Sequence, residues 1–170
     1  MEWIYKNNSD NSIRYVLGKK GKKTLVCFGI NPSTAEPNNL DSTLIKVEKI
    51  AEYNGYDGWI MFNVYPKRDT VFADLSAVCS DSEHITNLDY IMKTLCGFSK
   101  IDIWAAFGDH IYDRDYLVPC WIDIYNKLQK YNINWLSAAV NKSGAPKHPL
   151  YQSGSSVLKE FDMMSYISKL

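Results

Sequence analysis

The sequence lacks an excess of charge of either sign, and it lacks long apolar runs. Nineteen basic residues balance nineteen acidic residues, so the formal net charge at pH 7 is zero. Proteins that bind nucleic acid through bulk electrostatic attraction are usually basic, so we expect any contact with nucleic acid to be local. No apolar stretch approaches the roughly 18 residues of a membrane-spanning helix, and we expect no membrane partner.

Cysteine and histidine are few and scattered. The four cysteines form no Cys-x-x-Cys pair and no signal peptide precedes them, which is typical of reduced core thiols in a cytoplasmic protein. The three histidines lie far apart in the chain, so the sequence predicts no metal site and no cofactor. These residues are Cys27, Cys79, Cys96 and Cys120, and His84, His110 and His148.

Three motifs with well-understood chemistry are also absent. The chain has no Gly-x-x-x-x-Gly-Lys-Ser/Thr phosphate loop, no Gly-x-Gly-x-x-Gly dinucleotide fingerprint and no Gly-x-Ser-x-Gly nucleophile elbow. The corresponding nucleotide hydrolases, dinucleotide enzymes and serine hydrolases are therefore not indicated.

What is present is an ordinary globular composition in which strands and helices alternate. The 170 residues are 46% hydrophobic and 22% charged, which predicts one domain spanning residues 1–170. Apolar runs predict core strands at 24–30, 58–64, 101–107 and 133–138. Helical spacing predicts helices near 42–54, 83–96, 119–131 and 155–168. After an irregular start and a short strand at 13–17, this alternation predicts an α/β three-layer sandwich with a parallel sheet.

Polar or glycine-containing turns follow each predicted core strand. The ends of parallel strands share one edge of a sheet, and ligands of α/β proteins bind there. We therefore expect Asn31, Asn63, Gly108 and His148 to surround one crevice. The lysine-rich turn 19–23 precedes the first core strand, so it is expected at the opposite edge, as a solvated hairpin turn.

Asn31 and Asn63 are candidate ligand-binding amides. Pro32 biases Asn31 towards extended geometry, which leaves its amide at the strand tip to hold a water or a ligand. Asn63 ends an apolar strand, where both atoms of its amide can pair with the donor–acceptor edge of a nucleobase or similar heterocycle. Turn capping by Asn31 and closure of the last backbone bonds by Asn63 are the alternative interpretations.

His148 lies between Pro146 and Pro149, which restrict the backbone around it. An imidazole held in this way can donate a hydrogen bond to developing negative charge or transfer a proton. A histidine that only stabilises a turn is the alternative.

Other residues are weaker candidates. Arg68 has the guanidinium geometry that suits phosphate, or it is a solvated loop charge. Asp41 is equally a helix cap, Arg14 equally a surface residue, and Asp109 follows the third core strand. Gly108 is expected to allow a close approach of the backbone.

Several of these segments together resemble a bacterial and phage family named domain of unknown function 1643. The resemblance covers nearly the whole chain, and it implies no activity. The segments are Arg14-Tyr15, NPSTA (31–35), Asp41-Ser42-Thr43, NVYPKR (63–68), Asn87, Ala106-Phe107-Gly108 and GAPKHPLY (144–151).

A more distant similarity is to the uracil-DNA glycosylase superfamily. Residues 29–32 are similar to its first motif and residues 59–63 to its strand that ends in a base-reading Asn. Residues 105–108 resemble its third-strand block, and residues 148–153 resemble its His-Pro-Ser motif, with Leu150 in place of the Ser. The resemblance implies a four-stranded parallel sheet of order 2-1-3-4. It also implies a water held by Asn31, a base read by Asn63 and a departing base stabilised by His148.

The sequence thus predicts a hydrolase of glycosylase type, as in DNA repair, that cleaves an N-glycosidic bond. Its partner would be a nucleobase-containing small molecule or nucleic acid. Asn31 and His148 are the expected catalytic residues. The expected substrate-binding residues are Pro32, Ser33, Thr34, Asn63, Tyr65, Arg68, Gly108 and Tyr151, with either tyrosine stacking on the base.

Two other classes of function remain open at the level of sequence. A non-catalytic module that binds a nucleotide or a nucleic-acid end in the same cleft is favoured by Leu150 and by the missing carboxylate base near Asn31. An interaction protein is supported only by the aromatic content of 14%.

Overall fold

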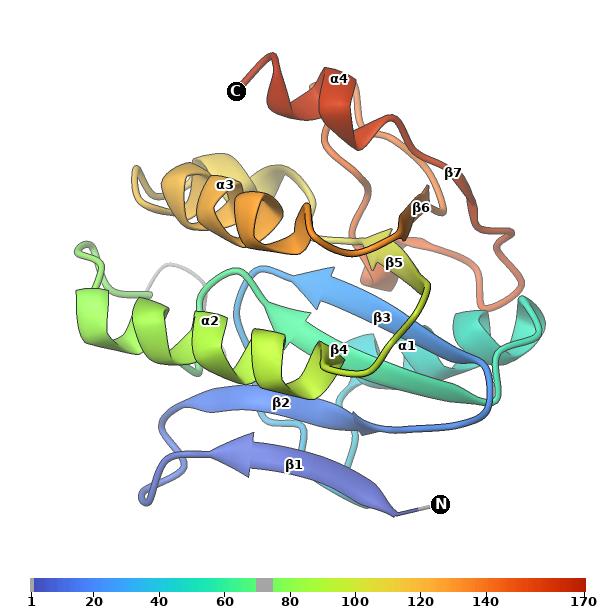
Figure 1. Cartoon of the computed structure of the whole chain (residues 1–170), viewed down its shortest axis with the longest axis horizontal. Helices are drawn as coiled ribbons and strands as arrows, with labels where there is room; N and C mark the ends of the chain where they lie inside the picture. The colour runs from blue at the N-terminus through green and yellow to red at the C-terminus, as the bar shows by residue number, and fades with distance from the viewer. Residues whose placement is uncertain (1, 70–74) are drawn as a thin grey trace.

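The computed structural model describes residues 2–69 and 75–170. Within them one mixed sheet has the order β1-β2-β4-β3-β5-β6-β7. The strands are β1 (Trp3–Asn7), β2 (Arg14–Lys19), β3 (Thr24–Gly29), β4 (Gly58–Asn63), β5 (Ile101–Ala105), β6 (Ile133–Ser137) and β7 (Lys159–Glu160). The helices are α1 (Ser42–Tyr53), α2 (Asp81–Leu95), α3 (Leu117–Leu128) and α4 (Met163–Ile167). The α/β class predicted from the sequence is confirmed (Figure 1).

The expected four-stranded parallel sheet is too small. The four predicted core strands are neighbours in the order β4-β3-β5-β6 and pair in parallel. However, β2 pairs antiparallel with β4, β1 pairs antiparallel with β2, and β7 pairs antiparallel with β6. Trp3–Asn7, expected to be irregular, is therefore an edge strand, because the exposed edge of β2 offers it a hydrogen-bonding partner.

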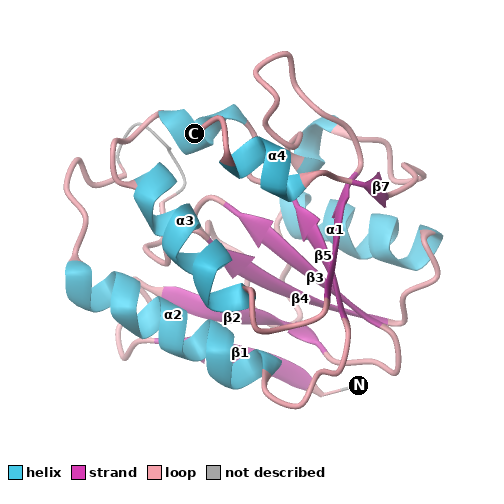
Figure 2. Cartoon of the chain, turned by 45° about the horizontal axis from the view of Figure 1, so that its top comes forward, coloured by secondary structure: helices cyan, strands magenta, loops and turns pink. Residues whose placement is uncertain are grey.

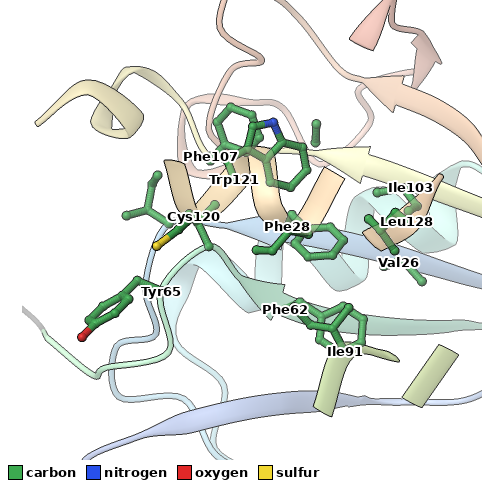
Figure 3. Packing of buried hydrophobic residues seen from close by; sticks show 14 of the residues in the cluster. Val26, Phe28, Phe62, Tyr65, Ile91, Ile103, Phe107, Cys120, Trp121 and Leu128 are labelled. Carbon is green, nitrogen blue, oxygen red and sulfur yellow. The ribbon is translucent and has the colours of Figure 1, made fainter. Parts of the chain in front are cut away.

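The two faces of the sheet carry separate apolar clusters, as strand alternation requires. Leu25 and Cys27 of β3 pack with the buried side chains of α1. Val26 and Phe28 point to the opposite face, where they pack with residues of α2 and α3. Figure 2 shows α1 on one side of the sheet and α2 and α3 on the other, and Figure 3 shows the second cluster from close by.

Local sequence signals explain where α1 begins and ends. The side chain of Asp41 accepts a hydrogen bond from Leu44 N at 2.9 Å, which caps the first turn. Gly55 has a φ of 76°, so the chain leaves the helix in the left-handed conformation that glycine favours. The helix predicted near 42–54 is confirmed at both ends.

The helix predicted at 155–168 is wrong. Leu158 packs with the α1-side cluster, whereas Phe161 and Ile167 pack with the cluster on the other face. One helix cannot present a single stripe to both faces of a sheet, so this segment forms β7 at the sheet edge and then the short α4. Asp162 caps α4 by accepting a hydrogen bond from Ser165 N at 2.9 Å.

The lysine-rich turn 19–23 lies where the sequence predicts. It joins the end of β2 to the start of β3, and its backbone contacts Asp57, which precedes β4. This is the amino-terminal edge of the parallel strands, away from their polar tips. Within the described parts of the chain, no helix combines the length and apolar character needed to cross a membrane.

Candidate functional site

A cavity of about 240 Å³ lies at the carboxyl edge of the central strands. Asn31 after β3, Asn63 at the end of β4 and His148 in the loop after β6 all line it. An adjoining cavity of about 320 Å³ shares His148 and is also lined by Gly108. The expected crevice is therefore confirmed for Asn31, Asn63 and His148, whereas Gly108 lines the adjoining cavity.

Asn31 presents an acceptor. Its Nδ2 donates to the backbone oxygens of Pro32 and Asp69, each at 3.3 Å. These two bonds fix the orientation of the amide, and Oδ1 accepts no hydrogen bond from any described residue. The atom of Asn31 that is left for a ligand is therefore Oδ1, which can accept a hydrogen bond from a water or an N–H group.

Asn63 presents a donor, because Arg14 holds the other end of its amide. Arg14 Nη2 donates to Asn63 Oδ1 at 3.2 Å, and a guanidinium can only donate, which fixes the assignment of the amide oxygen. A Cβ atom on Gly29 would lie 3.0 Å from Asn63 Nδ2, so this glycine leaves the amide nitrogen uncovered. The predicted pairing of both amide atoms with a base edge is thus reduced to one free donor.

Arg14 is the buried cation of the site and not a surface residue. It is 2% exposed, and its Nη1 donates to Ala35 O at 3.2 Å. Burial lowers its pKa to about 10, with a further contribution from the nearby charge of Arg68, while Asp41 acts in the opposite direction. The guanidinium is therefore still charged at neutral pH, and its buried Nε has no hydrogen-bond partner among the described residues.

His148 is a neutral imidazole with a defined tautomer. Burial lowers its pKa to about 4, and the neighbouring His110 adds to the effect. Its Nδ1 accepts a hydrogen bond from Leu150 N at 3.3 Å, so the ring proton is on Nε2. At neutral pH, His148 can donate a hydrogen bond from Nε2 without carrying a positive charge.

Gly108 brings the β5 end close to His148. Its φ of 68° and ψ of −168° belong to a conformation that is essentially restricted to glycine. A Cβ atom at this position would lie 3.2 Å from His148 Cβ. Gly108 N also donates to Pro146 O at 2.9 Å, which holds the loop that carries His148. The expected close approach of the backbone is confirmed.

Asp41 supplies a carboxylate in the cavity that Asn31 lines, so the expectation that a carboxylate base is missing near Asn31 is wrong. Its Oδ1 caps α1, yet the residue also lines the 240 Å³ cavity. Asp41 interacts electrostatically with both Arg14 and His148. The helix N-terminus also favours negative charge at this position.

Two further titratable residues of this cavity were not predicted. Asp69 and His110 both line the 240 Å³ cavity, and His110 Nδ1 lies 2.6 Å from Asp113 Oδ2. His110 lies in the turn that follows β5, next to Asp109, so the strand-end rule that selected the other candidates would have found it.

Five of the predicted binding residues do not line the 240 Å³ cavity: Gly108, which lines the adjoining one, and Pro32, Thr34, Tyr65 and Arg68. Tyr65 is 1% exposed, and its hydroxyl donates to Glu83 Oε2 at 2.6 Å. Figure 3 shows it in the cluster on the α2 and α3 face, so the prediction that it stacks on a base is wrong. Pro32 is buried in the turn, and Thr34 lines a separate pocket beside Arg68.

Arg68 clamps the NPSTA turn. It donates to the backbone oxygens of Ser33 and Ala35 and to the hydroxyl of Tyr5. The guanidinium of Arg68 therefore has a structural role in place of the phosphate contact expected from the sequence. Ser33 itself lines the 240 Å³ cavity.

Tyr151 is the aromatic residue at the cavity mouth. It is 67% exposed, lines both cavities and lies edge-on to His148 with ring centroids 6.1 Å apart. Of the two tyrosines considered for stacking, only Tyr151 is in position to contact a ligand.

The sequence was compared with known protein families, and the matched range includes most of the residues that line the cavity. The family described as protein of unknown function DUF1643 matches residues 14–150. The chain belongs to the DUF1643 family. The DUF1643 match spans the cavity lining from Arg14 to Leu150. Neither the curated proteins nor the solved structures contain a significant match.

Proposed function

We propose that this DUF1643 protein is a hydrolase that cleaves the N-glycosidic bond of a nucleobase-containing substrate. The observation that carries the proposal is the meeting of Asn31, Asp41 and neutral His148 in one small cavity. A volume of about 240 Å³ lies below the roughly 300 Å³ of typical drug-sized pockets, which suits a single base rather than a whole nucleotide.

The residues divide into two sets around such a base. Asn31 Oδ1 and the carboxylate of Asp41 are acceptors that would hold the attacking water. Asn63 Nδ2 and His148 Nε2–H are donors that would face the base. As the bond between C1′ and the base nitrogen breaks, its electron pair stays on the base and the sugar becomes positively charged. Donors placed to meet the new negative charge are commonly the largest contribution to catalysis.

The water then completes the reaction. Its oxygen bonds to C1′ and its proton passes to Asp41, which returns it to the departing base or to solvent. The products are the free base and a sugar with a hydroxyl at C1′. The order β4-β3-β5-β6 of the parallel strands supports a uracil-DNA glycosylase-like fold as part of the proposal.

The test is a screen for base release. The purified chain is incubated with nucleosides, nucleotides and oligonucleotides that contain modified bases, and free bases are separated by chromatography. Release that is lost in Asn31→Ala, while the variant keeps the wild-type melting temperature, would support the proposal. No release from any substrate in the screen would contradict it.

A non-catalytic module that binds a nucleotide is the second candidate. The observation that favours it is that Asn31, Asp41 and His148 each form a structural hydrogen bond in addition to lining the cavity. Saturable binding of a nucleoside or nucleotide without base release would select this candidate.

A further inference from the structure

The two adjoining cavities, together called the cleft from here on, are lined by several acidic residues. Asp41 and Asp69 line the 240 Å³ cavity, and Asp109 and Asp113 line the adjoining one. Among the described residues that line the two cavities, Arg14 is the only permanent cation. Residues 70–74 contain neither lysine nor arginine.

The guanidinium of Arg14 is already paired with neighbouring groups of the 240 Å³ cavity. Arg14 is 2% exposed and donates to Ala35 O and to Asn63 Oδ1. Asp41 is near enough to interact with it electrostatically. Arg14 therefore does not offset the carboxylates of Asp109 and Asp113 in the adjoining cavity.

The histidines change this balance little. His148 is neutral at pH 7, because burial lowers its pKa to about 4. His110 lies 2.6 Å from Asp113 Oδ2, so a proton on its ring would offset one carboxylate. Four carboxylates and one guanidinium leave the lining at a charge of −3, or −2 when His110 is protonated.

The two cavities are also placed to hold different parts of one nucleoside, the base in one and most of the sugar in the other. They share His148, His110 and Tyr151. A base in the 240 Å³ cavity would leave C1′ near Asn31 and Asp41, and the rest of its sugar would extend past His148 towards the cavity that Asp109 and Asp113 line. The sugar hydroxyls are donors that carboxylates accept well, whereas a 5′-phosphate would bring negative charge close to both aspartates.

We infer that the cleft accepts an uncharged or cationic nucleoside and discriminates against the corresponding 5′-nucleotide and against a nucleic-acid strand. This inference rests on the proposed function, since it assigns the substrate class of the same site. Like charges at a binding site oppose binding, and the basic turn at 19–23 lies at the opposite edge of the sheet, where it cannot neutralise a bound phosphate.

The experiment compares matched ligands that differ only in phosphate. Equilibrium binding and base release are measured for uridine, inosine and 7-methylguanosine, for their 5′-monophosphates, and for a short single-stranded oligonucleotide. We expect at least one nucleoside to bind about tenfold or more tightly than its 5′-monophosphate at low salt. The difference should shrink as added salt screens the carboxylates.

Variants identify the residues responsible. Asp109→Asn combined with Asp113→Asn removes two charges and keeps oxygen acceptors for Ser143 and His110. It should narrow the preference for nucleoside over monophosphate severalfold. Asp89→Asn, on the exposed surface of α2, removes one negative charge away from the two cavities and, as the control, should leave the preference unchanged.

The outcomes separate the inference from the proposed function. Tighter binding of a monophosphate or of the oligonucleotide overturns the inference, even if base release then supports a glycosylase. Failure of all three nucleosides to bind overturns it too. Preferential binding of a nucleoside without base release supports the inference and contradicts the proposed hydrolysis.

Discussion

At the scale of single residues, His148 combines a neutral ring with a fixed tautomer. Nδ1 is occupied by Leu150 N, so the proton on Nε2 is the one that can meet a departing base. Hydrogen bonds to a developing anion act mainly in the transition state. This separates a catalytic role for His148 from a structural one, because the two roles change different measurements.

The first prediction is that His148→Ala lowers turnover more than it lowers binding. Loss of one such donor typically costs about 3 kcal/mol, or roughly two orders of magnitude in rate. The measurements are single-turnover base release, the dissociation constant of the nucleoside and the melting temperature. A stable variant with wild-type turnover would remove His148 from the mechanism and favour the binding module.

The second prediction separates the two roles of Asp41. Asparagine caps helices about as well as aspartate, so Asp41→Asn should leave the melting temperature nearly unchanged. In the proposed reaction the amide cannot accept the proton of the attacking water, so base release should fall by about two orders of magnitude or more, since a general base usually contributes roughly 10²–10⁴-fold.

Asp162→Asn is the matched control for Asp41. Asp162 caps α4 through Ser165 N at 2.9 Å, and it does not line the 240 Å³ cavity. The control should keep full activity. Equal loss of activity in both variants would show that capping, and not proton transfer, explains the effect at Asp41.

At the scale of elements, the ends of β3, β4, β5 and β6 bring the site together, and Gly108 is where β5 meets the His148 loop. We predict that Gly108→Ala destabilises the fold and displaces His148. The backbone conformation alone should cost about 1–3 kcal/mol, and the new Cβ atom would press on His148 Cβ at 3.2 Å. The readouts are urea denaturation and base release by the folded fraction.

Gly97→Ala controls for the backbone effect. Gly97 has a φ of 88°, and a Cβ atom there would meet nothing within 4 Å. This variant should lose stability but keep the wild-type turnover of the folded fraction. If Gly108→Ala behaved in the same way, Gly108 would have no part in positioning His148.

For the hairpin turn at 19–23 we predict that substitution leaves ligand binding unchanged. The turn lies at the amino-terminal edge of the parallel strands, so replacing its four lysines with serine should leave nucleoside affinity within about twofold at moderate salt, since added salt screens charges at this separation. Titration of the variant and the wild type with the same nucleoside provides the test. Abolished affinity would place the ligand elsewhere in the molecule.

At the scale of the whole molecule, the buried His148 links stability to pH. Its pKa is about 4 in the folded protein and 6.5 in its ordinary state. The unfolded chain therefore binds an additional proton between these values, so the free energy of unfolding falls as pH is lowered from about 6.5 to 4. Below pH 4 this contribution no longer changes.

We predict that His148→Gln removes about 2 kcal/mol of the loss of stability between pH 7 and pH 4.5, allowing for the partial exposure of the ring. Urea denaturation of both proteins at the two pH values gives the difference, and the carboxylates that titrate in both proteins cancel. An unchanged pH dependence would mean that His148 is not held neutral by burial.

The sequence alone determined the features that depend on local periodicity and on chain connectivity. The four apolar core strands, the helices between them and the capping of α1 by Asp41 all follow from patterns within a few residues. The meeting of Asn31, Asn63 and His148 also follows, since strands joined by helical crossovers run parallel and end at one edge.

Only the tertiary structure decided which way side chains beyond the strand ends point and what they contact. Tyr65 comes two residues after β4 ends, where strand alternation no longer sets direction, and it enters the core. Arg14 is far from Asn63 in sequence, and β2 must pair with β4 before the guanidinium can hold the amide. The sequence likewise identifies Asp41 only as a helix cap, and it is the packing of α1 that places its carboxylate in the cavity lining. Contacts between distant segments depend on how the elements pack, and local sequence patterns do not encode that packing.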